Sequence, residues 1–369
     1  MEQTKIMPNN LLRDFEQYQK EFEDAALSAL RSGWYILGEQ LCGFEEQFAA
    51  YNHAKYCVGL ASGLDALWIA FRVLGIGEGD EVIVQANTYI ASVMGITING
   101  AAPVFVEPDD YYGIDADRIE EKITERTKAV LAVHLYGIPC QMDKIVDICN
   151  RHKLALVEDC AQSHGASFHG QMTGTFGDVG CFSFYPTKNL GAFGDGGAVL
   201  VGSDELDARF RIFRNYGSEE HYKNIIVGAN SRLDEIQAGM LKVKLKHLDE
   251  ITAKRQMIAK RYDEGITNPK FMLPKVRTGC SGVYHQYVIR AEDKEQRESL
   301  IEYLDERGIG TIIHYPIPPH LAEAYRYLGY RGGDFPITEH YADTVLSIPM
   351  YNGYTEEEQR YVIKALNEF

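Results

Sequence analysis

The sequence lacks any run of about eighteen apolar residues, the length that a membrane-spanning helix needs. Its first residues, MEQTKIMPNNLLRDFEQYQ, also lack the apolar segment of a secretory signal. The seven cysteines are odd in number and include no Cys-x-x-Cys spacing, which favours buried free thiols in a reducing compartment over a disulfide framework. We therefore expect a cytoplasmic protein without membrane contact.

Positive charge is also scarce. The chain has 37 Lys and Arg against 53 Asp and Glu, for a formal net charge of −16. Proteins that bind the phosphate backbone of nucleic acids carry a basic face, so we expect no nucleic-acid partner. The contents of 45% hydrophobic and 24% charged residues are typical of globular proteins, and 369 residues are enough for one large and one smaller domain.

Several familiar motifs are missing. The eleven histidines include no His-Glu-x-x-His, and His164 and His169 have no obvious third ligand, so we expect no metal site. The run Gly75-Ile-Gly77-Glu-Gly79 follows a helical pattern and precedes a strand, which is the reverse of the dinucleotide-binding order. It is predicted to be a helix-to-strand turn. No internal repeat and no Gly/Ser-rich linker occur, which indicates that the two domains pack together.

From about residue 56 to 200, short β-branched runs alternate with helical patterns. The predicted strands are Glu81–Val84, Pro103–Val106, Ala129–His134 and Leu154–Val157, and the predicted helices are Leu64–Leu74 and Met142–His152. This alternation is typical of an α/β domain with a mostly parallel sheet between helices.

The C-terminal part has a different pattern. Helical periodicity over Leu233–Tyr262 predicts one connecting helix, and the basic run Lys242–Lys246 on it is expected to form a solvated face. A strand at Tyr287–Ile289, a helix over Gln296–Arg307 and a final helix from Thr355 are predicted to follow. We therefore expect a large domain over residues 1–245, including an N-terminal arm, and a smaller C-terminal α+β domain over residues 246–369.

A lysine follows one of the apolar runs closely, in Gly177-Asp-Val-Gly-Cys-Phe-Ser-Phe-Tyr-Pro-Thr-Lys188-Asn-Leu-Gly-Ala-Phe-Gly-Asp-Gly-Gly197. Ligands of open α/β sheets collect at the carboxyl ends of the strands. A lysine that loses water there has a lowered pKa, and the neutral amine is the form that attacks an aldehyde to build a Schiff base. The alternative is an ordinary surface lysine, which only the surrounding residues can exclude.

The strand Leu154–Val157 ends in two acids, Glu158 and Asp159. A carboxylate at a buried strand end needs a cationic partner, and a protonated pyridine nitrogen would serve. Asp159 is the candidate for that role, because a protonated ring nitrogen keeps a pyridine cofactor an electron sink. Capping of the next turn is the simpler explanation for an isolated acid.

Two weaker signals accompany these residues. In Val58-Gly-Leu-Ala-Ser62-Gly63-Leu64, Ser62 is a natural N-cap, and the free amides of a helix start bind phosphate well. In Asn87-Thr88-Tyr89-Ile-Ala-Ser92, the ring of Tyr89 follows a strand and is placed to stack on a flat cofactor. A simple helix cap and a core aromatic, respectively, are the alternatives.

Taken in this order, the four elements resemble the sugar aminotransferases of the DegT/DnrJ/EryC1/StrS family, which share the aspartate-aminotransferase fold. The resemblance covers nearly the whole chain. It includes Ser32-Gly33-Trp34-Tyr35-Ile36-Leu37-Gly38, Phe44-Glu45, Thr88-Tyr89, Glu158-Asp159-Cys-Ala-Gln162, the lysine loop, Gly228-Ala-Asn230-Ser-Arg232-Leu-Asp-Glu235-Ile-Gln237-Ala and His314-Tyr315-Pro316.

The resemblance implies roles at specific positions. The cofactor would be pyridoxal 5'-phosphate, which becomes pyridoxamine 5'-phosphate in one half-reaction. Lys188 would be the Schiff-base lysine and proton shuttle, Asp159 the pyridinium partner and Gln162 the partner of the ring hydroxyl. Phosphate would be held by Ser62, Gly63, Leu64 and Ser183, with Tyr89 at the ring. Asn230 would complete the phosphate site of a neighbouring subunit, which implies a homodimer with shared active sites.

The resemblance also implies a reaction. L-glutamate would donate the amino group and leave as 2-oxoglutarate, and the acceptor would be a nucleotide-linked keto sugar. Because family members with histidine in place of the lysine are sugar dehydratases, Lys188 favours transamination. The lysine loop resembles that of the 3-keto subgroup and favours C3 as the reacting carbon. The expected substrate is a 3-keto-6-deoxyhexose, with dTDP as the expected nucleotide. The alternatives are a 4-keto sugar, a UDP-3-keto-uronate or a non-catalytic regulator. Candidate sugar and diphosphate contacts are Tyr185, Lys223, Arg232, His314 and Tyr315.

Overall fold

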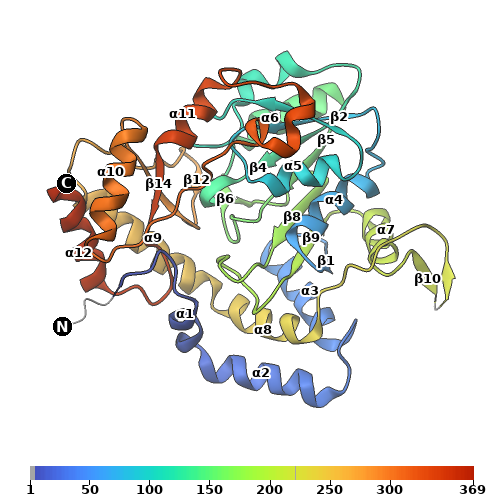
Figure 1. The fold of residues 1–369 in the computed structure, drawn as a ribbon. Helices are drawn as coiled ribbons and strands as arrows, with labels where there is room; N and C mark the ends of the chain where they lie inside the picture. The colour runs from blue at the N-terminus through green and yellow to red at the C-terminus, as the bar shows by residue number, and fades with distance from the viewer. Residues whose placement is uncertain (1–4, 221) are drawn as a thin grey trace.

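The computed structural model describes residues 5–220 and 222–369. Its centre is a seven-stranded sheet in the order β1-β9-β8-β5-β4-β2-β3 (Figure 1). The strands of this sheet are β1 Tyr56–Leu60, β2 Glu81–Gln85, β3 Ala102–Val106, β4 Thr127–Val133, β5 Ala155–Asp159, β8 Val179–Ser183 and β9 Gly197–Val201. The β2–β3, β2–β4, β4–β5 and β5–β8 pairs are parallel, while β9 runs antiparallel to both β8 and β1. The prediction of an α/β fold with a mostly parallel sheet is therefore confirmed.

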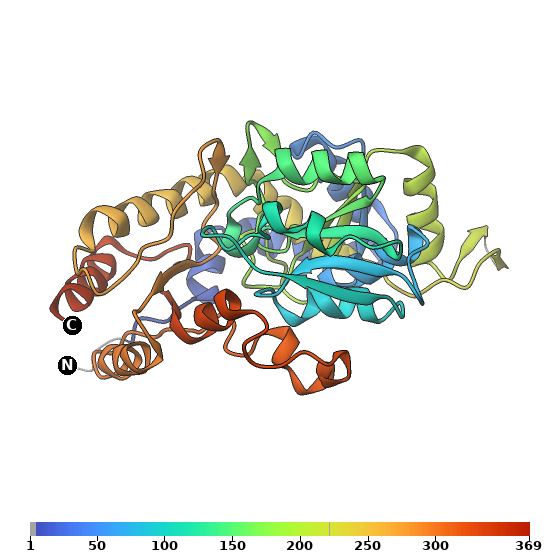
Figure 2. The ribbon, with the colours of Figure 1, turned by 90° about the horizontal axis from the view of Figure 1, so that it is seen from above.

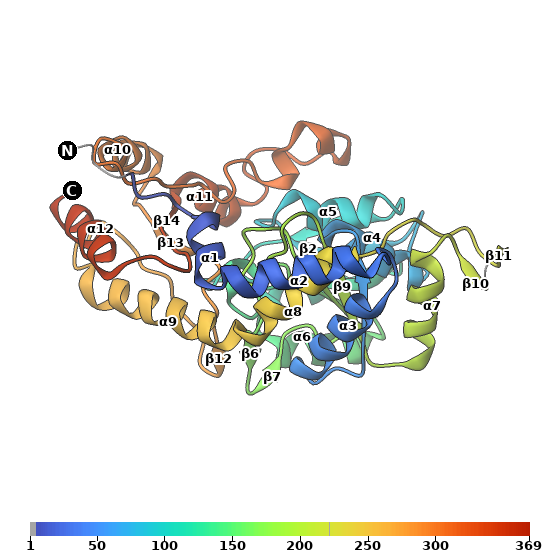
Figure 3. The same cartoon turned by 90° about the horizontal axis from the view of Figure 1, so that it is seen from below.

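Helices cover both faces of this sheet. The helices of the N-terminal two thirds are α1 Leu11–Gln17, α2 Gln19–Ser32, α3 Glu39–Tyr51, α4 Gly63–Val73, α5 Ile90–Thr97, α6 Met142–His152, α7 Asp204–Arg214 and α8 Glu235–Lys246. Figure 3 shows α4 and α5 on one side of the sheet and α3 and α6 on the other. The alternation along β2 explains this arrangement, because Val82 and Val84 pack with α4 while Ile83 packs with α6.

The C-terminal part adds α9 Leu248–Gly265, α10 Lys294–Asp305, α11 Pro336–Thr344, α12 Glu356–Glu368 and the antiparallel pair of β13 Tyr287–Arg290 with β14 Val345–Ile348. A separate apolar cluster joins α9, α10 and α12 to both strands. In contrast, Tyr325, Phe335 and Tyr341 pack with core residues of the large sheet. The two domains are thus in close contact, and the boundary at residue 245 stays a prediction.

Two small sheets lie outside these cores. A three-stranded sheet contains β6 Ser167–Phe168, β7 Gln171–Met172 and β12 Cys280–Ser281. The hairpin of β10 Ser218–Glu220 and β11 Lys223–Asn224 projects from the end of the molecule opposite α10 and α12 (Figures 1 and 2). This projection matters for the site, because the hairpin carries one of the predicted substrate residues.

Two predictions about the connecting helix are wrong. The helical pattern over Leu233–Tyr262 is interrupted at His247, whose non-helical backbone separates α8 from α9. Lys244 is not part of a solvated face, because it is buried and forms an ion pair with Asp14 of α1. The cause is that α8 packs between α2 and α3 rather than on the surface (Figure 3).

The turn after α4, the cysteines and the helix lengths were also predicted from the sequence. The turn at residues 75–79 does connect a helix, α4, to a strand, β2. The seven cysteines are free thiols, of which Cys42 is exposed and Cys280 half-buried while the other five are buried. Among the described residues, no helix combines the length and the apolar character that crossing a membrane requires.

A buried carboxylate ties β1 to α7. Glu45 on α3 accepts hydrogen bonds from the backbone N–H of Gly59 at 2.8 Å and from the guanidinium groups of Arg214 and Arg211. Glu45 and Arg214 are both nearly inaccessible to solvent, so each needs the other as a counter-charge. The Phe44-Glu45 part of the family resemblance is therefore structural.

Replacing Glu45 by Ala leaves the Arg214 charge buried without its carboxylate. We expect the free energy of unfolding to fall by about 3–5 kcal/mol, measured by urea denaturation. Glu205 on α7 forms an exposed ion pair with Arg209 and provides the control, because Glu205→Ala should change stability by less than about 1 kcal/mol. Equal effects of the two substitutions would contradict the assignment of Glu45 as an internal anchor.

Candidate active site

A cavity of about 520 Å³ opens where the parallel strands end. The carboxyl ends of β1, β5 and β8 lie at the same edge of the sheet, because all three strands run in one direction. This is the edge at which ligands of open α/β sheets bind. Eleven of the fourteen predicted site residues line the cavity: Ser62, Gly63, Leu64, Tyr89, Asp159, Gln162, Ser183, Tyr185, Lys188, His314 and Tyr315.

One wall of the cavity is the N-terminus of α4. Ser62 is its N-cap, and the Ser62 Oγ accepts a hydrogen bond from the Asp65 N–H at 3.1 Å. The backbone approaches Ser183 so closely that a Cβ atom on Gly63 would lie 2.4 Å from the Ser183 Cβ. Only glycine fits this contact. The first N–H groups of the helix therefore point toward the cavity beside two hydroxyl groups, which is a suitable set of donors for a phosphate.

Lys188 approaches the cavity from the loop after β8. Its backbone N–H donates to the Tyr185 carbonyl oxygen at 2.8 Å, which closes a tight turn. Burial lowers the pKa of the Lys188 amine to about 8, and the negative charge of Asp159 opposes this shift. About a tenth of the amine is therefore neutral and nucleophilic at pH 7, far more than for an ordinary lysine with a pKa of about 10.4.

Asp159 is the last residue of β5, and its side chain is almost fully buried. Its Oδ1 accepts a hydrogen bond from the Ala161 N–H at 3.1 Å. The carboxylate and the Lys188 amine both face the same cavity. The position fits the predicted partner of a protonated ring nitrogen, since a cation there would compensate a buried negative charge.

Gln162 is held by two tyrosines. Its Oε1 accepts from the Tyr136 N–H at 2.6 Å, and its Nε2 donates to the Tyr315 hydroxyl at 3.0 Å. One amide hydrogen of Gln162 is left for a ligand. The rings of Tyr315 and Tyr89 lie 4.9 Å apart at the mouth, where half of the Tyr89 surface remains exposed. Tyr89 is thus not a core residue, and its ring is free to stack on a flat ligand.

Three histidines surround the lysine without adding charge. Burial and the Lys188 charge lower the pKa of His164 to about 3 and that of His314 to about 4, and the same causes depress the pKa of His285. His314 Nδ1 is 2.8 Å from the Ser347 hydroxyl. The imidazoles are therefore neutral at pH 7, and those of His285 and His314 act as hydrogen-bonding groups rather than as cations.

These residues together match the shape and polarity of pyridoxal phosphate. The α4 terminus with Ser62 and Ser183 offers donors to a phosphate, Asp159 offers an acceptor to a ring nitrogen, and Gln162 offers a donor to a ring hydroxyl. The amine of Lys188 faces the same space. The donor set fits the cofactor that the resemblance implies.

Three predicted residues lie away from this cavity in their own chain. Asn230 is exposed and pairs with Asn215 through a β-bridge. Lys223 forms ion pairs within the hairpin, and Arg232 donates to the Asn215 side chain at 3.0 Å. Their predicted roles therefore require a neighbouring subunit and stay predictions.

Other cavity residues were not predicted. Thr88, Ser92, His134, Asp195, His285 and Gln286 also line the cavity. Thr88 and Ser92 belong to a segment in which only Tyr89 was assigned a role. His285 and Gln286 directly precede a predicted strand. Their polar character at this position was the one sequence signal that could have identified them as site residues.

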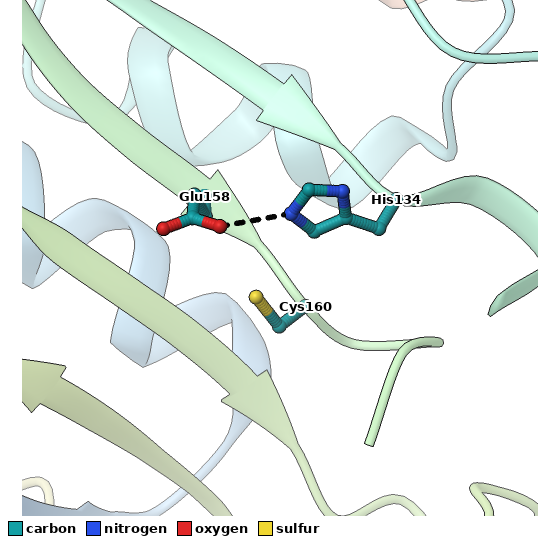
Figure 4. Close-up of side chains that lie close together, drawn as sticks. All are labelled: His134, Glu158 and Cys160. Carbon is teal, nitrogen blue, oxygen red and sulfur yellow. Dashed lines mark hydrogen bonds and ion pairs between the residues drawn. The ribbon is translucent and has the colours of Figure 1, made fainter. Parts of the chain in front are cut away.

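His134, which also lines the cavity, forms a tight buried group with Glu158 and Cys160 (Figure 4). His134 Nδ1 accepts from the Cys140 N–H at 3.1 Å, so the ring proton lies on Nε2 and points to Glu158 at 3.0 Å. Glu158 accepts further bonds from the N–H groups of residues 174, 176 and 177. With both ring nitrogens of His134 engaged, the group is explained as a structural clamp, and the absence of a metal stays a prediction.

The lowered pKa of Lys188 can be measured by ¹³C NMR on protein with labelled lysine and without cofactor. We expect one resonance, lost in Lys188→Ala, to titrate near pH 8 while ordinary lysines titrate at about 10.4. Asp159→Asn should move this midpoint to lower pH, because the carboxylate stabilises the ammonium form. A midpoint at the ordinary value would contradict the desolvated amine.

Comparison with known proteins agrees with the site. The model of the DegT/DnrJ/EryC1/StrS aminotransferase family matches residues 16–367. A protein of Aneurinibacillus thermoaerophilus named dTDP-3-amino-3,6-dideoxy-alpha-D-galactopyranose transaminase is 49% identical over 354 residues, which is 96% of each chain. The crystal structure of S. venezuelae DesV in complex with ketimine intermediate superposes with a TM-score of 0.96 at 43% identity and covers 99% of this chain and 98% of that one. The structure of ntda from Bacillus subtilis with bound cofactor PMP has a TM-score of 0.89 at 30% identity and covers 95% and 82%. The chain belongs to the DegT/DnrJ/EryC1/StrS aminotransferase family.

Proposed function

We propose that this protein is a pyridoxal-phosphate-dependent aminotransferase that moves an amino group from L-glutamate to C3 of a nucleotide-linked 3-keto-6-deoxyhexose. The single observation that carries the proposal is the convergence of Lys188, Asp159 and the α4 N-terminus on one cavity. The nearby relative named as a dTDP-3-amino sugar transaminase supports dTDP as the nucleotide and C3 as the reacting carbon.

The residues that would hold the cofactor are Ser62, Gly63, Leu64 and Ser183 at its phosphate, Asp159 and Gln162 at its ring, and Tyr89 on its face. Bound pyridoxal phosphate would supply an electron sink and carry the amino group between two half-reactions. A neighbour's Asn230 would add a donor at the phosphate. The structure bound to PMP supports this cofactor for the family fold.

Lys188 would have two tasks in the chain's own chemistry. Its neutral amine would hold the cofactor covalently through the aldehyde carbon, with loss of water, and when it is free again its Nζ would accept and return a proton. A pKa of about 8 suits both tasks, because the amine can accept and release a proton near neutral pH. Asp159 would balance the charge of the ring nitrogen.

The keto sugar would be bound between the two domains. Tyr185, His314 and Tyr315 line the cavity within the same chain. Their hydroxyl and imidazole groups are suited to hydrogen-bond with sugar hydroxyls. A diphosphate needs cations, and Lys188 is the one lysine or arginine among the residues lining this cavity. Lys223 and Arg232 of a neighbouring subunit are the proposed source of that charge.

A homodimer is the proposed assembly. Large apolar side chains are exposed on α2 and just after it, among them Leu27, Leu30 and Trp34, and Val227 is 95% exposed beside the hairpin. Exposed apolar side chains concentrated along one helix and one hairpin favour a protein partner. A second copy would cover them and would bring residues 223–232 to the neighbour's cavity.

The activity is tested with purified protein, L-glutamate and candidate sugars. We expect a visible absorbance band after addition of pyridoxal phosphate. Without a keto sugar, L-glutamate should release at most a single equivalent of 2-oxoglutarate per site, and continued release should require a dTDP-linked 3-keto sugar. Lys188→Ala should lose the band and the turnover, by at least about 10³-fold, because nucleophile and proton shuttle disappear together. A band without turnover on any keto sugar would favour the regulator alternative, and product NMR with nitrogen at C4 would refute the assignment to C3.

The shared site is tested with mixed dimers. Lys188→Ala and Asn230→Ala chains are each expected to be poorly active alone. If Asn230 acts on the neighbour's cofactor, a mixed dimer contains one cavity with both Lys188 and Asn230 intact, and mixing restores activity. If Asn230 acts within its own chain, the mixed dimer contains no intact cavity, and the mixture stays as inactive as its parts.

A further inference from the structure

We propose that Ser92, supported by Thr88, is a positioning residue that fixes the carboxylate of Asp159 for the cofactor's ring nitrogen. The inference rests on the proposed function, because it concerns how Asp159 is presented to pyridoxal phosphate. Neither hydroxyl has been given a role so far, although both residues line the cavity.

The hydrogen bonds form a directed chain. The Ser92 hydroxyl donates to Asp159 Oδ2 at 2.7 Å, and the Ser92 and Thr88 hydroxyl oxygens are also 2.7 Å apart. A serine hydroxyl has one proton, and an ionised carboxylate can only accept. The Ser92 proton therefore goes to Asp159, and Thr88 must donate to Ser92. Such a chain polarises each successive bond toward the carboxylate.

Both carboxylate oxygens of Asp159 are engaged by protein donors. Oδ1 is bound by the Ala161 N–H, and Oδ2 is bound by Ser92. Two donors on different oxygens fix the plane of the carboxylate and leave its other lone pairs for a ligand. Without Ser92, the Asp159 side chain would be held at one oxygen only and could rotate about its Cβ–Cγ bond.

Burial keeps these hydrogen bonds in place. Thr88 and Ser92 are each 1% exposed and Asp159 is 5% exposed, so neither hydroxyl can exchange its partner for bulk water. A buried hydroxyl without a partner costs free energy, and a hydrogen bond to a charged group is among the stronger ones. The carboxylate and the hydroxyls therefore hold each other in place.

Tyr89 and Ser92 both lie at the start of α5. Tyr89 is the N-cap of α5, and Thr88 and Ser92 are four residues apart on either side of the helix start. Tyr89 consequently faces the cavity mouth while the two hydroxyls lie below it against β5. One short segment would thus set both the face and the nitrogen edge of the cofactor.

The protein contains a second buried pair of hydroxyl groups that serves as a matched control. Ser163 and Thr173 form another buried pair of hydroxyls 2.9 Å apart, and Thr173 also donates to the Ser163 carbonyl oxygen. Ser163 lies close in sequence to Asp159, yet its hydroxyl bonds to Thr173 rather than to that carboxylate. Ser163→Ala therefore removes a comparable buried hydroxyl and leaves the hydrogen bonds among Thr88, Ser92 and Asp159 intact.

The experiment measures equilibrium binding of pyridoxal phosphate to cofactor-free protein. We expect Ser92→Ala to raise the dissociation constant by about 10-fold or more, as loss of a hydrogen bond to a charged group implies. Thr88→Val should raise it by about 3-fold and Ser92→Thr, which keeps the hydroxyl, should bind like the parent. Ser163→Ala is expected to leave binding unchanged.

A cofactor analogue tests whether the effect passes through the ring nitrogen. With C–H in place of that nitrogen, the analogue has no use for an oriented Asp159, so Ser92→Ala and the parent should bind it equally. An equal loss for cofactor and analogue would mean that Ser92 is merely structural and would overturn the inference. If Ser92→Ala fails to fold by circular dichroism, Thr88→Val with the same two ligands decides between these outcomes.

Binding of pyridoxal phosphate by the parent protein separates a failure of the proposed function from a failure of the role of Ser92. A parent protein that does not bind pyridoxal phosphate would overturn the proposed function itself. A parent that binds it, together with a Ser92→Ala variant that binds equally well, would overturn only the role of Ser92.

Discussion

The opposition between the buried amine of Lys188 and the buried carboxylate of Asp159 governs this structure. Burial lowers the pKa of the amine, and the negative charge of Asp159 opposes that shift. The sheet makes the arrangement possible, because β5 and β8 are parallel neighbours and end at the same edge. The loop after β8 then returns Lys188 toward the end of β5, where a charged aromatic ligand would be held between the two groups.

Much of the polar framework around this pair consists of carboxylates that bind the chain's own backbone. Glu158 clamps the loop before β8, and Glu235 accepts the N–H groups of Gly38, Gln40 and Leu41 at the start of α3. Glu107 binds the first turn of α11 and so joins the C-terminal part to β3. Glu158 and Glu235, which belong to the family resemblance, thus position strands and loops and are not among the residues that line the cavity.

The cavity of one chain has the groups for a cofactor but few for an anionic substrate. Lys188 supplies its one lysine or arginine, whereas Lys223 and Arg232 lie outside it near the projecting hairpin. With a net charge of −16, the chain as a whole would repel a nucleotide diphosphate. Local cations from a second copy would overcome that repulsion and make substrate binding depend on assembly.

The sequence by itself determined the α/β class and most strands of the central sheet, and it predicted the residues of the candidate site with the help of the family resemblance. These features are local, since β-branched runs, helix caps such as Ser62 and residues just after a strand can be read in short windows. Tertiary structure alone decided that the helix breaks at His247, that Lys244 is buried and that Ser92 bonds to Asp159, 67 residues away. Each of these depends on which elements become neighbours in space, and that information is not contained in any single segment.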